Sequence, residues 1–266
     1  MTMNPLPQTK AELLALTKNL PDDAFFLEHS RTRELAYIER SYPRWMEIIG
    51  IAQARLQTPE RLSCLDIGTS PLTFLLRNYF GKVSALDLSD ALRKRCETAG
   101  IALHAGGVNA PAVISSLEKV DCIFFLEVLE HLHSDPVEVL KGIRSLLRPG
   151  GLLVLSTPNM MCLANRVLML CNRRLHHFSY PPFTQCDQAH GHQHDRIYMP
   201  MELADYFAAS GFQTVELLYQ LNVDAMAHQA DSLVRRIVAQ GPRLLKLVFP
   251  SLRDGMIMVG RAPQSL

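Results

Sequence analysis

Short apolar runs alternate with helix-forming segments over the middle of the chain, and this alternation is the strongest constraint on the fold. The apolar runs are continuous, which is typical of parallel strands buried on both faces. We expect strands at residues 62–67, 82–88, 101–104, 120–125 and 152–156, and helices at 71–79, 90–99 and 136–147, the last ending at Arg148-Pro149-Gly150-Gly151. This order of elements predicts an α/β fold with a parallel sheet covered on both sides.

Two different segments flank the regular alternation. Residues 9–57 have mainly helical periodicity, punctuated by Pro21 and Pro43, and we interpret residues 1–58 as an N-terminal helical lid. Residues 59–266 are interpreted as the main domain, with substrate-side insertions at 160–200 and 221–254. Beyond residue 159 we expect helices at 160–170 and 201–210, and strands at 212–219 and 255–260.

Composition limits the classes of partner and the compartment. The net charge is +1, so the chain as a whole has no electrostatic attraction for nucleic acid or acidic membranes. The six cysteines form no CxxC pair, and no apolar stretch reaches the roughly 20 residues that span a bilayer. The first ten residues lack the pattern of a signal peptide. We therefore expect a reduced, cytoplasmic protein.

A nucleotide-binding pattern follows the first two predicted strands. Gly68 comes directly after the first strand, within Asp66-Ile67-Gly68, where a glycine lets the backbone approach a ligand closely. Asp87 ends the second strand, where a carboxylate can accept both hydroxyls of a ribose. The further glycines that G-x-G-x-x-G needs are missing, and this turn has Ser70 and Leu72. A simple turn glycine remains the alternative interpretation of Gly68.

A cluster of acidic residues and a histidine follows the fourth predicted strand, in Glu127-Val128-Leu129-Glu130-His131. On a helix, positions 127, 130 and 131 share one face. Two carboxylates and an imidazole would then converge at the carboxyl end of a core strand, which is where open α/β sheets bind ligands. The alternative is that these glutamates only favour a helix N-terminus and that the histidine is solvated.

Several motifs in a fixed order resemble the class I S-adenosylmethionine-dependent methyltransferases. They are Asp66-x-Gly68, Asp87, Asp121, Leu147 to Gly151, Ser156-Thr157-Pro158-Asn159, and Tyr198 to Leu203 followed by Ser210-Gly211-Phe212. The resemblance covers roughly residues 60–220. It implies a Rossmann-like, mostly parallel sheet of seven strands with the last strand antiparallel. It also implies cofactor contacts from Asp66, Gly68, Thr69, Ser70, Asp87, Leu88, Val108, Asn109 and Glu127.

Two metal-dependent groups of this family carry a Glu-x-x-Glu-His motif after the fourth strand: the ubiquinone-pathway O-methyltransferases and the small-RNA 2′-O-methyltransferases. The resemblance implies that Glu127, Glu130, His131 and His194 bind a divalent cation such as Mg, Mn, Fe or Zn. Such a cation lowers the pKa of a coordinated hydroxyl and so activates it toward the methyl sulfonium. Without a metal, His131 or His194 would be the catalytic general base.

The resemblance predicts methyl transfer from S-adenosylmethionine to a hydroxyl of a small molecule, a glycan or a lipid-linked substrate. Three alternatives remain: 2′-O-methylation of RNA, which the near-zero charge disfavours; a non-catalytic cofactor-binding relative, because the turn at Gly68 is poor in glycine; and a nicotinamide oxidoreductase, which the missing glycines disfavour. Residues 231–249, within the insertion at 221–254, pair basic and apolar faces. They could lie on a membrane surface, form a dimer contact or cover the active site, but packing on their own domain is the interpretation we favour.

Overall fold

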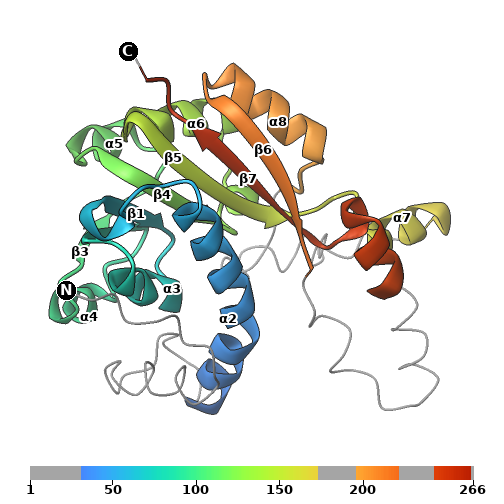
Figure 1. The fold of residues 1–266 in the computed structure, drawn as a ribbon, viewed down its shortest axis with the longest axis horizontal. Helices are drawn as coiled ribbons and strands as arrows, with labels where there is room; N and C mark the ends of the chain where they lie inside the picture. The colour runs from blue at the N-terminus through green and yellow to red at the C-terminus, as the bar shows by residue number, and fades with distance from the viewer. Residues whose placement is uncertain (1–30, 173–195, 222–242, 265–266) are drawn as a thin grey trace, which may run out of the picture. The chain divides into compact units, whose positions relative to one another are not determined.

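Residues 31–172, 196–221 and 243–264 are described in the computed structural model of the chain (Figure 1). Their strands form a seven-stranded sheet in the order β3-β2-β1-β4-β5-β7-β6. Strands β1, β2 and β3 pair in parallel, whereas β6 and β7 are antiparallel. The predicted Rossmann-like sheet with an antiparallel last strand is therefore confirmed. The strands are β1 (Ser63–Ile67), β2 (Lys82–Asp87), β3 (Ala102–Ala105), β4 (Val120–Leu126), β5 (Leu147–Pro158), β6 (Gln213–Gln220) and β7 (Gly255–Arg261).

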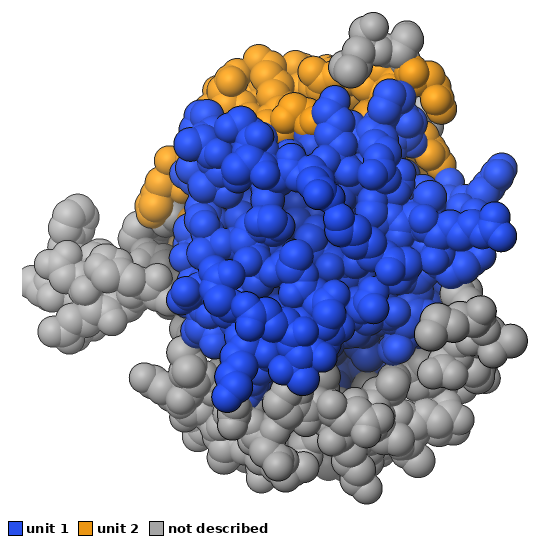
Figure 2. All heavy atoms as spheres, turned by 90° about the vertical axis from the view of Figure 1, so that its left-hand side faces the viewer, with its two compact units in different colours: residues 1–124, 146–152 blue, residues 125–145, 153–266 orange. Residues whose placement is uncertain are grey.

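The chain separates into two compact units, coloured blue and orange in Figure 2. The first unit consists of residues 1–124 and 146–152, and the second of residues 125–145 and 153–266. Strands β4 and β5 each contribute residues to both units. The division between a helical lid and a main domain at residue 58 stays a prediction.

Helix α2 (Arg31–Gln53) continues through Pro43, where the sequence predicted an interruption. Proline removes one backbone hydrogen bond and normally kinks or ends a helix. The turns after Pro43 carry Trp45, Ile48 and Ile49, whose side chains are all buried in the core of the first unit. Burial of three large apolar side chains outweighs the local cost of the proline, so tertiary packing overrides the sequence signal.

The shorter helices of the first unit differ from expectation at their ends. The helix predicted at 71–79 is α3 (Pro71–Leu75) followed by a 3-10 turn (Leu76–Asn78). The helix predicted at 90–99 is α4 (Arg93–Thr98). Helix α5 (Pro111–Ser116) was not predicted, because six residues are too few for helical periodicity to be recognised.

The sequence Arg148-Pro149-Gly150-Gly151 belongs to strand β5, so its interpretation as a helix stop is wrong. Helix α6 (Pro136–Ser145) ends earlier, and β5 already begins at Leu147. A Cβ atom at Gly151 would lie 3.2 Å from the carbonyl oxygen of Asp121. The glycine is therefore explained by the close approach of two backbones rather than by the end of a helix.

Helix α8 (Pro200–Ala209) packs closely on β7 in the second unit (Figure 1). A Cβ atom at Gly260 of β7 would lie 2.9 Å from the ring of Phe207 on α8, so this contact requires a glycine. The helix is followed by Gly211, as predicted. The second unit also contains helix α7 (Leu163–Leu170) and a helical segment at 243–248. Over the three described ranges, no helix has the length and apolar character needed to cross a membrane.

The cysteines of the described ranges are free thiols. Cys64, Cys96, Cys122 and Cys162 are buried, whereas Cys171 is exposed. Burial raises the pKa of the Cys64 thiol, and the neighbouring Cys122 and Asp66 raise it further. These buried cysteines therefore serve as small apolar side chains in the core, as the sequence predicted for Cys64 and Cys122.

Candidate functional site

The turn after β1 depends on one glycine and one capping serine. Gly68 has a φ of 90°, a value that other residues rarely adopt, and its N–H donates to the carbonyl of Leu86 at 2.9 Å. Ser70 has extended backbone, with a φ of −149°, and its hydroxyl accepts the N–H of Leu72 at 3.2 Å to cap α3. The backbone conformation at position 70 therefore does not require the glycine that the dinucleotide-binding motif has there.

Asp66 lies beneath this turn and is only 1% exposed. Its carboxylate accepts the hydroxyl of Thr73 at 2.5 Å, and the same hydroxyl accepts the N–H of Ser70 at 2.9 Å. Burial raises the pKa of Asp66 to about 7; the charge of Asp87 adds to the rise and the Thr73 hydrogen bond opposes it. In this arrangement Asp66 holds the turn in place from inside the core.

Asp87 ends β2 beside the same turn. Its Oδ2 accepts both the backbone N–H of Thr69, at 2.7 Å, and the Thr69 hydroxyl. Its Oδ1 accepts the N–H of Ser89 at 3.0 Å. The structure therefore brings together Gly68, Thr69 and Asp87, three residues predicted to contact the cofactor, at the carboxyl ends of β1 and β2.

The loop after β3 adds the residues predicted to flank an adenine. The N–H of Gly106 donates to the carbonyl of Asp87 at 2.7 Å, which ties this loop to β2. A Cβ atom at Gly107 would lie 2.5 Å from Asn109 Oδ1 and 3.7 Å from Leu88 Cδ2. The Leu88 side chain is 80% exposed, whereas Val108 is buried. Leu88 therefore offers an open apolar surface beside Asp87, and the place of Val108 and Asn109 beside an adenine stays a prediction.

The acidic-histidine cluster does not lie on one face of a helix, so this prediction is wrong. After β4 the chain forms only a three-residue 3-10 turn (Leu129–His131), and helix α6 begins at Pro136. Glu127 has a φ of 55°, in the left-handed region, and therefore cannot be the first residue of a right-handed helix. A non-glycine residue held in this conformation is strained, and such strain is found preferentially at functional sites.

The two carboxylates of the cluster are held by neighbouring hydroxyls of β5. The Ser156 hydroxyl donates to Glu127 Oε1 at 2.7 Å, and the Thr157 hydroxyl donates to Glu130 Oε2 at 3.0 Å. Because successive side chains of a strand point to opposite faces, these bonds draw Glu127 and Glu130 to opposite sides of β5. Glu130 is fully buried and Glu127 is partly exposed.

A cation site is not formed by the described residues alone. Within residues 31–172, 196–221 and 243–264, no three His, Cys, Asp or Glu side chains are grouped as a metal would require. Glu127 and Glu130 accept hydrogen bonds from two different residues of β5, Ser156 and Thr157. His194, the remaining predicted ligand and alternative base, lies outside the described residues. The metal and the role of His194 therefore stay predictions.

Arg196 fixes the chain beside Glu130, a role that was not predicted. Its backbone N–H donates to the Glu130 carbonyl at 3.3 Å. Its guanidinium donates to Glu202 and, at 2.8 Å, to the Tyr206 hydroxyl, and it lies 5.3 Å from the ring centre of Tyr198. Burial raises the pKa of Tyr198 to about 12, against the opposing charge of Arg196. The one feature of the sequence that could have indicated this role is the pair of tyrosines, Tyr198 and Tyr206, that follows Arg196.

Comparison with known sequences agrees with the motif order. The model of the family described as "Methyltransferase domain" matches residues 34–217. A "Ubiquinone biosynthesis O-methyltransferase" of Cereibacter sphaeroides is 32% identical over 106 residues, which are 38% of this chain and 42% of that protein. One of the same name from Roseobacter denitrificans is 32% identical over 122 residues, 42% and 49% of the two chains. The matches thus span less than half the length of these curated relatives.

Comparison with solved structures shows the same fold at low sequence identity. A putative methyltransferase in complex with the Trm112 activator of Haloferax volcanii has a TM-score of 0.58 at 16% identity, covering 88% of this chain and 95% of the other. An S-adenosylmethionine-dependent methyltransferase of Mesorhizobium loti has a TM-score of 0.52 at 17% identity, covering 84% and 97%. These likenesses establish the architecture alone.

Proposed function

The chain belongs to the methyltransferase-domain family, and on this premise we propose that it transfers a methyl group from S-adenosylmethionine to a hydroxyl oxygen. The observation that carries the proposal is the joint position of Gly68, Thr69 and Asp87 at the carboxyl ends of β1 and β2. This is the edge at which open α/β sheets bind nucleotides. An exposed Leu88 beside Asp87 fits a ligand with both a ribose and an apolar base.

The residues of the first unit have separate parts in cofactor binding. Asp87 would accept hydrogen bonds from ribose hydroxyls, because an ionised carboxylate is an acceptor with about four sites. Gly68 would admit the methionine part close to the backbone. Leu88 would contact one face of the adenine, with Asn109 near its edge. Asp66 would act indirectly, by holding the turn through Thr73.

Oxygen is the proposed acceptor atom because the curated relatives that match are named O-methyltransferases. A hydroxyl becomes a good nucleophile only when it loses its proton. His131 follows the buried Glu130 at the end of the 3-10 turn and is partly exposed, so we assign it the role of general base. The methyl group then moves from sulfur to oxygen, and S-adenosylhomocysteine is released.

The test is a direct measurement of binding and turnover. Purified protein is titrated with S-adenosylhomocysteine by calorimetry, and then incubated with methyl-labelled S-adenosylmethionine and either a catechol or an RNA oligonucleotide ending in a 2′,3′-diol. We expect binding and label transfer to the catechol. Label in the RNA would show that the acceptor is RNA and not a small molecule, a glycan or a lipid-linked substrate. Binding without any turnover would favour a non-catalytic relative. Absence of binding would refute the proposal.

No catalytic step is assigned to a divalent cation, because the described carboxylates Glu127 and Glu130 are held on opposite sides of β5. If a cation binds, the remaining predicted ligands are His131 and His194. Its contribution would be to acidify a coordinated hydroxyl. Elemental analysis of the purified protein, together with the methyl-transfer rate before and after dialysis against a chelator, decides whether this chemistry operates.

Among the acceptors, a lipid-linked molecule is supported by the apolar surface of the second unit. The helical turn at 243–248 directs Lys246 toward Asp254, at 2.7 Å, while Leu244, Val248 and Phe249 are exposed. Leu170 at the end of α7 is 88% exposed. A basic segment with outward-facing apolar side chains suits peripheral membrane contact. Co-sedimentation with vesicles of neutral or anionic phospholipid tests this partner; equal recovery without vesicles would exclude it.

A further inference from the structure

Thr69 makes two hydrogen bonds to a single oxygen of Asp87. Its backbone N–H donates to Oδ2 at 2.7 Å, and its hydroxyl donates to the same atom. The other oxygen, Oδ1, accepts the N–H of Ser89 at 3.0 Å. Because two of the three donors are backbone groups fixed by the turns, only the Thr69 hydroxyl can leave Asp87 by a side-chain rotation.

Asp87 has few acceptor sites, and the Thr69 hydroxyl occupies one that a ligand would need. An ionised carboxylate has about four acceptor sites, two on each oxygen. Three are used within the chain, and both sites of Oδ2 are filled by Thr69. One site remains, on Oδ1. A ribose presents two adjacent hydroxyls, so a ligand that bonds through both needs one more site than Asp87 offers in this arrangement.

We infer that the Thr69 hydroxyl occupies the position of one ribose hydroxyl on Asp87 and competes with the cofactor for it. This inference rests on the proposed function, since it assumes that the ribose of S-adenosylmethionine binds Asp87. Binding then exchanges one hydroxyl donor for another on Oδ2. When the product leaves, the Thr69 hydroxyl returns, so Asp87 is never left without that donor. Thr69 thereby lowers the affinity for cofactor and product and speeds product release.

A second pair in the same turn shows why Asp87 is the carboxylate at which this exchange can occur. Thr73 donates its hydroxyl to Asp66 at 2.5 Å, so both acids of the turn are bound by a threonine. Asp66 is 1% exposed, whereas Asp87 is partly exposed at the edge of the sheet. A ligand can reach the Thr69 pair only, and the Thr73 pair supplies a matched control.

The experiment compares Thr69→Val with the wild-type protein, because valine has the shape of threonine without its hydroxyl. The probes are S-adenosylhomocysteine and its analogue that lacks both ribose hydroxyls. Affinity is measured by calorimetry and dissociation by stopped flow. We expect Thr69→Val to bind S-adenosylhomocysteine about three- to tenfold more tightly, the equivalent of one net hydrogen bond, and to release it more slowly. Its affinity for the analogue should be unchanged.

Three further variants separate competition from a structural effect. Thr69→Ser restores a hydroxyl and should return the affinity to that of the wild type. In an Asp87→Asn background, Thr69→Val should have no effect on affinity. Thr73→Val should lower the thermal midpoint without tightening binding. If Thr69→Val misfolds, Thr69→Ala also removes the hydroxyl and takes its place.

The outcomes distinguish this inference from the proposed function. If the wild-type protein binds no S-adenosylhomocysteine, the proposed function fails. If the wild type binds and Thr69→Val binds equally or more weakly, the competition is refuted while the proposed function stands. An equal gain in affinity for the analogue without ribose hydroxyls would also refute it, because the gain would then not involve the ribose.

Discussion

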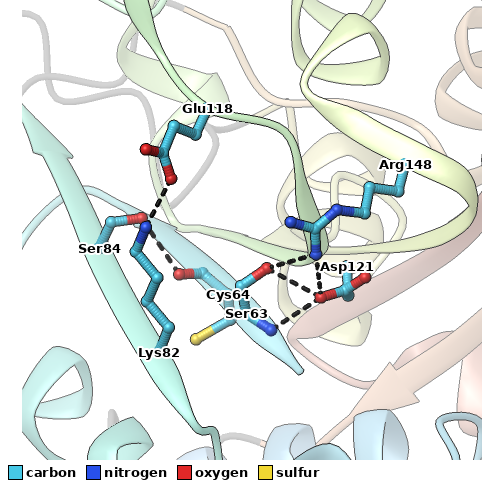
Figure 3. A network of polar contacts seen from close by, with 7 residues as sticks. All are labelled: Ser63, Cys64, Lys82, Ser84, Glu118, Asp121 and Arg148. Atoms are coloured by element: carbon cyan, nitrogen blue, oxygen red, sulfur yellow. Dashed lines mark hydrogen bonds and ion pairs between the residues drawn. The ribbon is translucent and has the colours of Figure 1, made fainter. Parts of the chain in front are cut away.

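In the first unit, the carboxylates at the amino ends of the strands have different hydrogen-bond partners from the carboxylates at the carboxyl ends. At the amino ends, Asp121 accepts the N–H and the hydroxyl of Ser63, both at 2.8 Å, and the guanidinium of Arg148 at 2.6 Å (Figure 3). At the carboxyl ends, Asp66 and Asp87 accept only hydroxyl and backbone N–H groups. Over the part of the chain that is described, neither of these two acids forms an ion pair with lysine or arginine.

This difference separates a structural edge from the proposed binding edge. At Asp121 burial favours the neutral acid, but the hydrogen bonds of Ser63 and Arg148 outweigh it and lower the pKa. At Asp66 burial prevails and the pKa rises to about 7. Asp121 therefore already has a cation of the chain beside it, whereas Asp66 and Asp87 accept hydrogen bonds from neutral donors alone. Asp87 is the partly exposed acid of this second kind.

The largest expected effect is a difference in pH dependence between the two edges. The folded-state pKa of Asp66 lies above its unfolded value, so its stabilising contribution is complete below about pH 4 and is lost as pH rises through about 7. Relative to Asp66→Asn, the wild-type free energy of unfolding should fall by up to about 4 kcal/mol over that range. Urea denaturation at several pH values measures it.

Asp121→Asn is the matched control for this prediction. The pKa of Asp121 is lowered in the folded state, so its contribution is present above the unfolded pKa and is lost as pH falls. The difference in the free energy of unfolding between the wild type and Asp66→Asn should therefore fall as pH rises, whereas the difference between the wild type and Asp121→Asn should increase. Parallel slopes would show that the two edges do not differ in the way proposed.

The next effect concerns binding at the carboxyl edge. Asp87→Asn should weaken S-adenosylhomocysteine about 10- to 100-fold, because charge-assisted hydrogen bonds to ribose are lost. Calorimetric titration measures the change. Asp90→Asn removes a nearby exposed carboxylate that faces Arg93 at 3.6 Å and should bind like the wild type. Equal losses in the two variants would mean that only the net charge matters.

A smaller effect is expected at the amino edge. Arg148→Met removes the cation from Asp121 but leaves both Ser63 hydrogen bonds in place. The Arg148 side chain is 50% exposed, so solvent screens the pair, and the free energy of unfolding should fall by only about 0.5–1 kcal/mol. The affinity for S-adenosylhomocysteine should not change. A loss of binding here would contradict the assignment of this edge to structure.

The smallest effect is expected for the exposed pair of Lys82 and Glu118 at the same edge (Figure 3). Both side chains are well exposed, so water and salt replace the interaction. Lys82→Gln should leave the denaturation midpoint and cofactor affinity unchanged within error. A measurable loss of stability that disappears at high salt would show that this pair contributes to the amino edge after all.

The strands were predictable from sequence because their physical signal is local. Runs such as residues 122–126 are apolar without interruption, and burial on both faces of a parallel sheet requires this pattern. The positions of Gly68 and Asp87 followed for the same reason, since each comes at the end of such a run. The carboxyl ends of parallel strands lie along one edge, so sequence position alone predicted that these residues meet.

The acidic-histidine cluster was not predictable in the same way, because its geometry depends on a distant strand. Helical spacing suggested that Glu127 and Glu130 share a face, but Ser156 and Thr157 of β5 hold them on opposite sides. The left-handed backbone at Glu127 has no signal in the sequence, since glutamate rarely adopts it. The anchoring of Arg196 to Glu130 likewise joins segments far apart in the chain.

The strand order has a consequence for synthesis of the protein. Strand β6 neighbours only β7 among the described strands, although β7 follows it in the sequence. A ribosome that has delivered residues 213–220 must still deliver residues 255–261 before β6 can join the sheet. Until then β6 is a strand without its partner, and unpaired strands invite association with other chains. Completion of this part of the sheet is therefore a late event in translation. A chaperone can bind the unpaired β6 strand in the interval before β7 is synthesised.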